Sequence, residues 1–73
     1  MRTCKIFLYD KSYSDLVHKT TIEVGEDDDI KTIRWNEMWF DLEGCGTGAD
    51  GVEICEYFPK QIFLRERPSQ DLD

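Results

Sequence analysis

Residues 3 to 9 read Thr-Cys-Lys-Ile-Phe-Leu-Tyr, and residues 16 to 24 read Leu-Val-His-Lys-Thr-Thr-Ile-Glu-Val. Alternation in the first stretch places Cys4, Ile6 and Leu8 on one face, which is the period of a β-strand. Large side chains also occupy its other face, which favours a central strand. The second stretch alternates too, and four of its last five residues are β-branched. Together they predict a β-hairpin.

Further alternating stretches follow this hairpin along the chain. They lie at residues 30 to 35, 38 to 43, 52 to 58 and 61 to 66. Asn36-Glu37 is predicted to be a tight turn, although it lacks the glycine that such turns prefer. In the stretch after it, Met38, Phe40 and Leu42 are expected to face the core, with Trp39 on the solvent side. Ile62 and Leu64 are expected to point inward in the final stretch.

A glycine-rich segment, residues 43 to 51, is predicted to be a loop because it carries four of the five glycines. For residues 52 to 58, β-branching and the following Pro59-Lys60 turn signal favour a strand. A short helix at residues 50 to 58, capped by Asp50, is the alternative.

The spacing of these stretches, roughly ten residues, is typical of small β-structures. We therefore predict an all-β fold, a small antiparallel barrel or sandwich of five to six short strands. Residues 1–67 are expected to form a single compact domain. Residues 68–73 follow a proline and are mostly polar, so they are expected to be a flexible C-terminal tail.

Composition excludes several classes of protein. A chain of 73 residues has no room for a multi-domain enzyme, and a hydrophobic fraction of 40% is too high for a disordered acidic tail. The net charge of -7 opposes contact with phosphate backbones, so we expect no direct nucleic-acid binding. No apolar run is long enough to span a membrane, and the odd number of cysteines favours reduced thiols in the cytoplasm.

Three cysteines and one histidine supply the ligand count of a zinc site. These residues are Cys4, His18, Cys45 and Cys55. No two cysteines lie closer than ten positions, whereas zinc modules present their ligands in close pairs. We therefore expect no metal and no cofactor, with Cys4 and Cys55 as small buried side chains and Cys45 as a loop thiol.

Two other ligand motifs are weak. Residues 46 to 51 match the G-x-G-x-x-G pattern, but they lie in no βαβ unit and are flanked by acids, which argues against a dinucleotide. The acidic run at residues 26 to 29 lacks the spacing of an EF-hand. His18 has no nucleophile that the sequence assigns to it, so we expect a non-catalytic protein.

The acidic run and the solvent side of residues 38 to 43 predict a surface that binds a basic protein partner. The expected binding residues are Asp27, Asp28, Asp29, Trp39, Asp41 and Glu43. In size and acidity the chain resembles the small acidic inhibitors of bacteriophages and other mobile elements, some of which mimic DNA phosphates. That resemblance implies an inhibitor that occupies a nucleic-acid-binding surface of a host protein. A structural or assembly subunit that forms a homodimer is the alternative.

Overall fold

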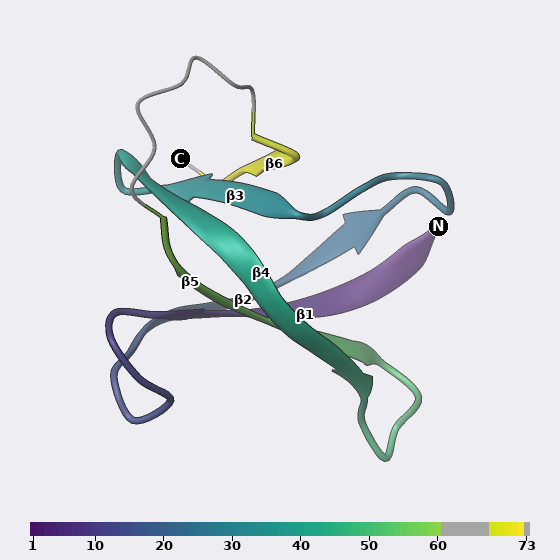
Figure 1. The fold of residues 1–73 in the computed structure, drawn as a ribbon. Coiled ribbons are helices and arrows are strands. Elements are labelled where there is room, and N and C mark those ends of the chain that lie inside the picture. Colours follow the sequence, from purple (N-terminus) through teal and green to yellow (C-terminus); the bar gives the residue numbers. More distant parts are fainter. Residues whose placement is uncertain (61–67, 73) are drawn as a thin grey trace.

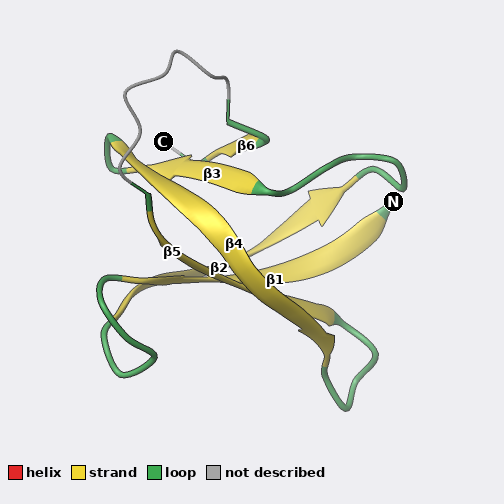
Figure 2. Ribbon diagram, viewed as in Figure 1, coloured by secondary structure: helices red, strands yellow, loops and turns green. Residues whose placement is uncertain are grey.

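A computed structural model describes residues 1–60 and 68–72. Every regular element in these residues is a strand (Figure 2). The strands are β1 (Arg2–Tyr9), β2 (Leu16–Val24), β3 (Thr32–Trp35), β4 (Met38–Thr47), β5 (Glu53–Pro59) and β6 (Gln70–Asp71). The predicted all-β class is confirmed. The strand predicted at residues 61 to 66, with Ile62 and Leu64 inward, lies outside the described residues.

The six strands form one sheet in the order β2-β1-β5-β4-β3-β6. Neighbours are antiparallel except for β1 with β5 and β3 with β6, which are parallel. The sheet is therefore mixed, not purely antiparallel as predicted. The reason is that the chain reaches β5 from β1 only after β2, β3 and β4, and a connection of that length allows two parallel neighbours.

The sheet curls into a half-barrel, in which β4 and β5 link β3 to β1 and β2 (Figure 1). The hydrophobic core fills its concave, inner face. The buried core residues are Cys4, Ile6, Leu8, Val24, Ile30, Ile33, Phe40, Cys55 and Tyr57. Although β2 and β3 are not neighbours in the sheet, the rings of His18 and Trp35 stack at 4.5 Å. Side chains therefore close the half-barrel where backbone pairing does not.

The hairpin of β1 and β2 agrees with the prediction, except that β1 begins one residue earlier, at Arg2, and that a register shift puts Leu16 opposite Tyr9, off the face of His18. Cys4, Ile6 and Leu8 are fully buried. Because β1 lies between β2 and β5, it is a central strand, as the large side chains on both its faces predict.

Asn36 and Glu37 form the tight turn between β3 and β4, as predicted. Both adopt positive φ values, 53° and 61°. These angles fit a type I′ turn, whose twist matches that of the flanking strands.

The segment that contains four glycines was predicted to be a loop, and this is wrong for its first half. Gly44 and Gly46 belong to β4, opposite Glu56 and Ile54 of β5. Backbone pairing with β5 satisfies their polar groups and outweighs the low strand propensity of glycine. The true loop is shorter and includes Gly51, whose φ is 82°. Residues 53 to 59 form a strand, so the favoured prediction is confirmed over the helix.

The last described residues join the sheet. Gln70 and Asp71, in the segment expected to be a flexible tail, pair with Ile33 and Arg34 as β6. Leu72 packs against the core. Among residues 1–60 and 68–72, no helix is long and apolar enough to cross a membrane.

Candidate functional site

The predicted acidic surface begins with Asp27, Asp28 and Asp29, which lie between β2 and β3. The Asp28 carboxylate accepts a hydrogen bond from the Gly25 amide at 3.0 Å. The Asp29 carboxylate accepts one from the Lys31 amide, also at 3.0 Å. Two of these three carboxylates therefore hold the shape of the loop.

The other predicted binding residues lie on β4. Alternation with the buried Phe40 places Trp39 and Asp41 on the outer face, the side of the sheet turned away from the core. Trp39 is half-buried, not exposed as expected. Its strand is covered on both sides, because Trp39 pairs with Arg34 of β3 and its carbonyl accepts the Lys60 amide at 2.9 Å.

The structure separates Trp39 from the acidic run but not Asp41. Trp39 lies beside the turn that ends β3, whereas Asp27 to Asp29 precede the start of β3 (Figure 1). Asp41 pairs with Thr32 at the start of β3, and the Leu42 amide donates to the Lys31 carbonyl at 2.8 Å. Asp41 therefore lies at the end of β3 that follows the acidic run, and Trp39 lies at the other end.

A surface hollow of about 260 Å³ lies next to the β4 residues, lined by Tyr13, Glu43 and Phe58. Phe58 stands directly opposite Asp41 across β4 and β5. The ring of Tyr13 meets that of Phe58 edge-on at 5.1 Å. Tyr13 is 60% exposed. The rings of Tyr13 and Phe58 and the carboxylates of Asp41 and Glu43 therefore lie in one part of the outer face.

Tyr9 packs against Phe58, one of the residues that line this hollow. Its ring stacks on Phe58 at 5.4 Å, and its hydroxyl donates to Glu56 at 3.2 Å. Burial, then the Glu56 carboxylate, raises the pKa of Tyr9, so the phenol stays protonated as the donor. Sequence reasoning missed Tyr13 because it lies in a polar turn, where a lone aromatic residue is the only signal.

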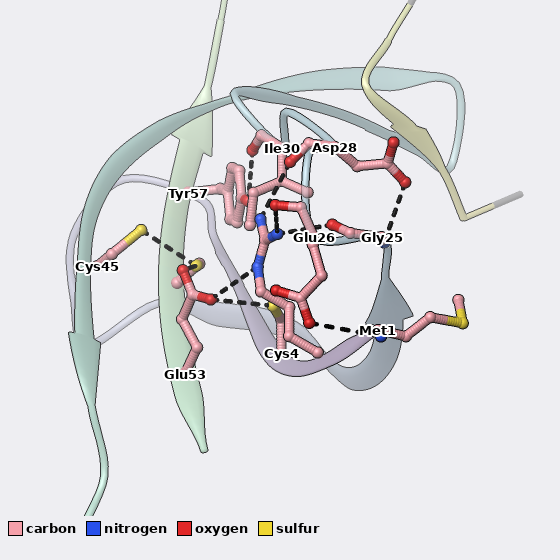
Figure 3. A network of polar contacts seen from close by, with 11 residues as sticks. Met1, Cys4, Gly25, Glu26, Asp28, Ile30, Cys45, Glu53 and Tyr57 are labelled. Carbon is pink, nitrogen blue, oxygen red and sulfur yellow. Dashed lines mark hydrogen bonds and ion pairs between the residues drawn. The ribbon is translucent and has the colours of Figure 1, made fainter. Parts of the chain in front are cut away.

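A second cluster lies on the inner face, where the three cysteines gather around Glu53; Figure 3 labels Cys4, Cys45 and Glu53. They come from three adjacent strands: Cys4 from β1, Cys55 from β5 and Cys45 from β4. The Sγ atoms of Cys45 and Cys55 are 3.1 Å apart. Cys4 and Cys55 are buried, as predicted, whereas Cys45 is an exposed strand residue and not a loop thiol.

A β-bulge explains why Cys45 reaches this face. Leu42 pairs with Tyr57 and Gly44 pairs with Glu56, so Glu43 is an extra residue in β4. Each extra residue reverses the alternation beyond it. Without the bulge, Cys45 would point to the outer face with Trp39 and Asp41.

Glu53 lies among the thiols. Its Oε2 atom accepts hydrogen bonds from the Cys4 thiol at 3.4 Å and from Arg2 Nε at 3.1 Å. Its Oε1 atom lies 3.7 Å from Cys55 Sγ. The Arg2 guanidinium also donates to backbone carbonyls of the acidic loop, those of Gly25, Glu26 and Asp28.

His18, the fourth ligand considered in the sequence, is not in this cluster, because it stacks on Trp35. Burial raises the pKa of the Cys55 thiol well above its ordinary value, and the neighbouring Cys45 adds to the effect. Cys55 is therefore a protonated thiol unless an electrophile or a metal ion displaces its proton.

Comparison of the chain with protein-family models, curated proteins and solved structures gives no match.

Proposed function

We propose that this chain is a non-catalytic, acidic protein-binding module that engages a basic protein surface through its outer face. The observation that carries the proposal is the hollow lined by Tyr13, Glu43 and Phe58. The net charge of -7 supports it, since long-range attraction raises the rate of encounter with a basic partner.

The hollow suits an arginine side chain. A guanidinium stacks on aromatic rings and pairs with carboxylates, and here Tyr13 and Phe58 offer the rings while Glu43 offers the carboxylate. Asp41, opposite Phe58, adds a second carboxylate to the same face. Asp41 and Glu43 of the sequence prediction thus contribute to the proposed surface, whereas Trp39 is not among the described residues that line the hollow.

The acidic loop has a lesser part in this proposal. Asp28 and Asp29 each use one carboxylate oxygen to bind the backbone of their own loop, and the second oxygen of Asp29 lies 3.9 Å from the Lys31 ammonium. Asp27 has no hydrogen bond or ion pair among the described residues, so its charge acts by long-range attraction.

Nucleic-acid-binding proteins offer basic surfaces of this kind, and an inhibitor that occupies one is the specific form of the proposal. It places the protein in the cytoplasm, a compartment that keeps three free cysteines reduced.

A binding assay with short peptides tests the proposal. Oligoarginine is expected to bind more tightly than oligolysine of equal length, because the planar guanidinium stacks on an aromatic ring and pairs with a carboxylate through two donors at once. Tyr13→Ala should weaken oligoarginine binding by about 2 kcal/mol, a typical loss for an aromatic anchor. Glu43→Gln should weaken it more than Asp27→Asn, which removes the same charge from the loop.

Equal affinities for the two peptides, together with an unchanged affinity in Tyr13→Ala, would refute the proposal. Such a result would leave only diffuse attraction between opposite charges.

A homodimer is the second candidate, and the edge of the sheet favours it. Strand β2 is an edge strand of 9 residues, with Leu16 46% exposed and Val17 44% exposed. Long edges with apolar residues pair readily with a second copy. Sedimentation separates the candidates: a dimer that Val17→Lys converts to a monomer supports this one, and a monomer at all concentrations excludes it.

A further inference from the structure

We propose that Cys45, Glu53 and Cys55 form a zinc-binding site on the inner face of the sheet. One donor atom from each of the three residues lies within 4.8 Å of the other two. Thiolate sulfur and carboxylate oxygen are established zinc ligands, and two sulfurs favour zinc over hard ions such as calcium and magnesium.

The pairing of β4 with β5 brings two cysteines together, as a zinc knuckle does in other proteins. Cys45 and Cys55 are direct partners across β4 and β5, so they approach one another although ten positions separate them. Tetrahedral zinc with Zn–S bonds of about 2.3 Å places two sulfurs about 3.7 Å apart. The observed 3.1 Å therefore has to widen slightly. Cys45 is exposed and has room to turn.

Glu53 is held in the orientation that the site requires. Arg2 and the Cys4 thiol both bind its Oε2 atom. This leaves Oε1 on the side of Cys55, 3.7 Å from the sulfur. Arg2 is fixed in turn by three loop carbonyls, so it acts as a positioning residue for the carboxylate.

The charges of the site are balanced. Two thiolates and one carboxylate carry three negative charges, which zinc and the Arg2 guanidinium together neutralise. The exposure of Cys45 gives the ion a route of entry and leaves a fourth position for water.

Zinc has to displace the thiol protons, so its affinity should rise with pH. Burial, which raises the pKa of Cys55, makes its proton harder to displace and extends this dependence to higher pH. The groups that face Cys55 from the neighbouring strands and from its own are Cys4, Cys45, Glu53 and Tyr57. Of these, the carboxylate favours the metal-bound form, because it is itself a ligand.

This inference does not depend on the proposed function, since the hollow lies on the outer face. The decisive experiment is a titration of the reduced, metal-free protein with zinc alone, against a chromophoric chelator. We expect one ion per chain. Cobalt as a probe should give a thiolate charge-transfer absorption band.

Variants define the ligand set. Cys45→Ser and Cys55→Ser should each abolish tight binding, and Glu53→Gln should weaken it strongly. Cys4→Ser retains a hydroxyl donor for Glu53, so it should weaken zinc binding less than about tenfold. That is the smallest loss of affinity typical when a hydrogen-bond partner of a metal ligand is changed. His18→Ala is the control and should bind as the wild type does.

Cys45 is exposed, so Cys45→Ser is expected to fold, and circular dichroism checks this. The inference is overturned if this variant binds zinc as tightly as the wild type or if one ion bridges two chains. It is also overturned if Cys4→Ser loses as much affinity as Cys55→Ser, or if zinc fails to protect the Cys45 and Cys55 thiols from forming a disulfide.

Discussion

Cys45 and Cys55 face one another across β4 and β5 with their Sγ atoms 3.1 Å apart, and the bulge at Glu43 is what turns Cys45 toward its partner. One thiol is exposed and the other is fully buried. The exposed thiol meets reagents from solvent first, and the buried one lies in contact with it.

Mild oxidation of the metal-free protein should therefore link these two residues. A hydroperoxide oxidises the Cys45 thiolate to a sulfenic acid, and the Cys55 thiol then displaces water to form the disulfide. Mass spectrometry should show an intramolecular bond that joins residues 45 and 55, with Cys4 still open to alkylation after unfolding. Dimers linked through Cys45 would contradict this geometry.

The turn between β3 and β4 contains a strained backbone conformation that a glycine would relieve. Glu37 has a φ of 61°, a conformation that costs a residue with a side chain about 1 to 2 kcal/mol. Glu37→Gly should raise the free energy of unfolding by about 0.5 to 1 kcal/mol after the entropy of glycine is deducted. Thermal denaturation measures the change.

Gly51 is the matched control for that substitution, since its φ is 82°. Gly51→Ala should lower stability by about 1 kcal/mol. A destabilised Glu37→Gly variant would show that contacts of the Glu37 side chain outweigh its backbone strain.

Tyr57 links stability to alkaline pH. Its hydroxyl donates to the buried Ile30 carbonyl at 2.6 Å, and burial, then the Cys55 thiol, raises its pKa above the ordinary 10.0. A raised pKa means that the unfolded chain loses its proton first, so the stabilisation is complete below about pH 10 and is lost as the pH rises further. Burial also raises the pKa values of the Cys4 and Cys55 thiols. Because the unfolded thiols ionise near pH 9, the loss of stability starts there.

Tyr57→Phe tests this account. The variant should lose about 1 to 3 kcal/mol at neutral pH, because the Ile30 carbonyl is left without its donor. Above about pH 10 it should show a shallower fall in stability than the wild type. Denaturant titrations at a series of pH values measure both effects, and parallel pH profiles for the two proteins would contradict the assignment.

The register of β4 predicts a contrast between adjacent residues. Phe40 is fully buried, whereas Trp39 is half-buried on the outer face. Phe40→Ala should cost about 3 kcal/mol through the cavity it opens. Trp39→Ala should cost less and leave unfolding cooperative. A larger loss for Trp39→Ala, measured by denaturant unfolding, would mean that the strand faces the other way.

The sequence was informative where alternation continued without interruption, although Met38, which was expected to face the core with Phe40, is 39% exposed beside the turn. It predicted the hairpin of β1 and β2, the inward face of Cys4, Ile6 and Leu8, and the turn at Asn36-Glu37. Local pattern sufficed there because each strand buries one face and each turn joins consecutive strands.

The convergence of the cysteines was beyond sequence reasoning. It depends on the parallel pairing of β1 with β5 and on the bulge at Glu43, and neither leaves a local pattern. Likewise, the acidic run gave no sign that Asp28 and Asp29 serve their own loop. Tyr13 was missed because the contact with Phe58 joins residues far apart in the chain.

Binding of a basic partner at the hollow on the outer face can be located by a titration followed by nuclear magnetic resonance. Oligoarginine added to isotope-labelled protein should shift the signals of Tyr13, Asp41, Glu43 and Phe58 in a saturable way. Signals of residues 26 to 29 should move little. Shifts concentrated in residues 26 to 29, or spread evenly over the acidic surface, would contradict the account.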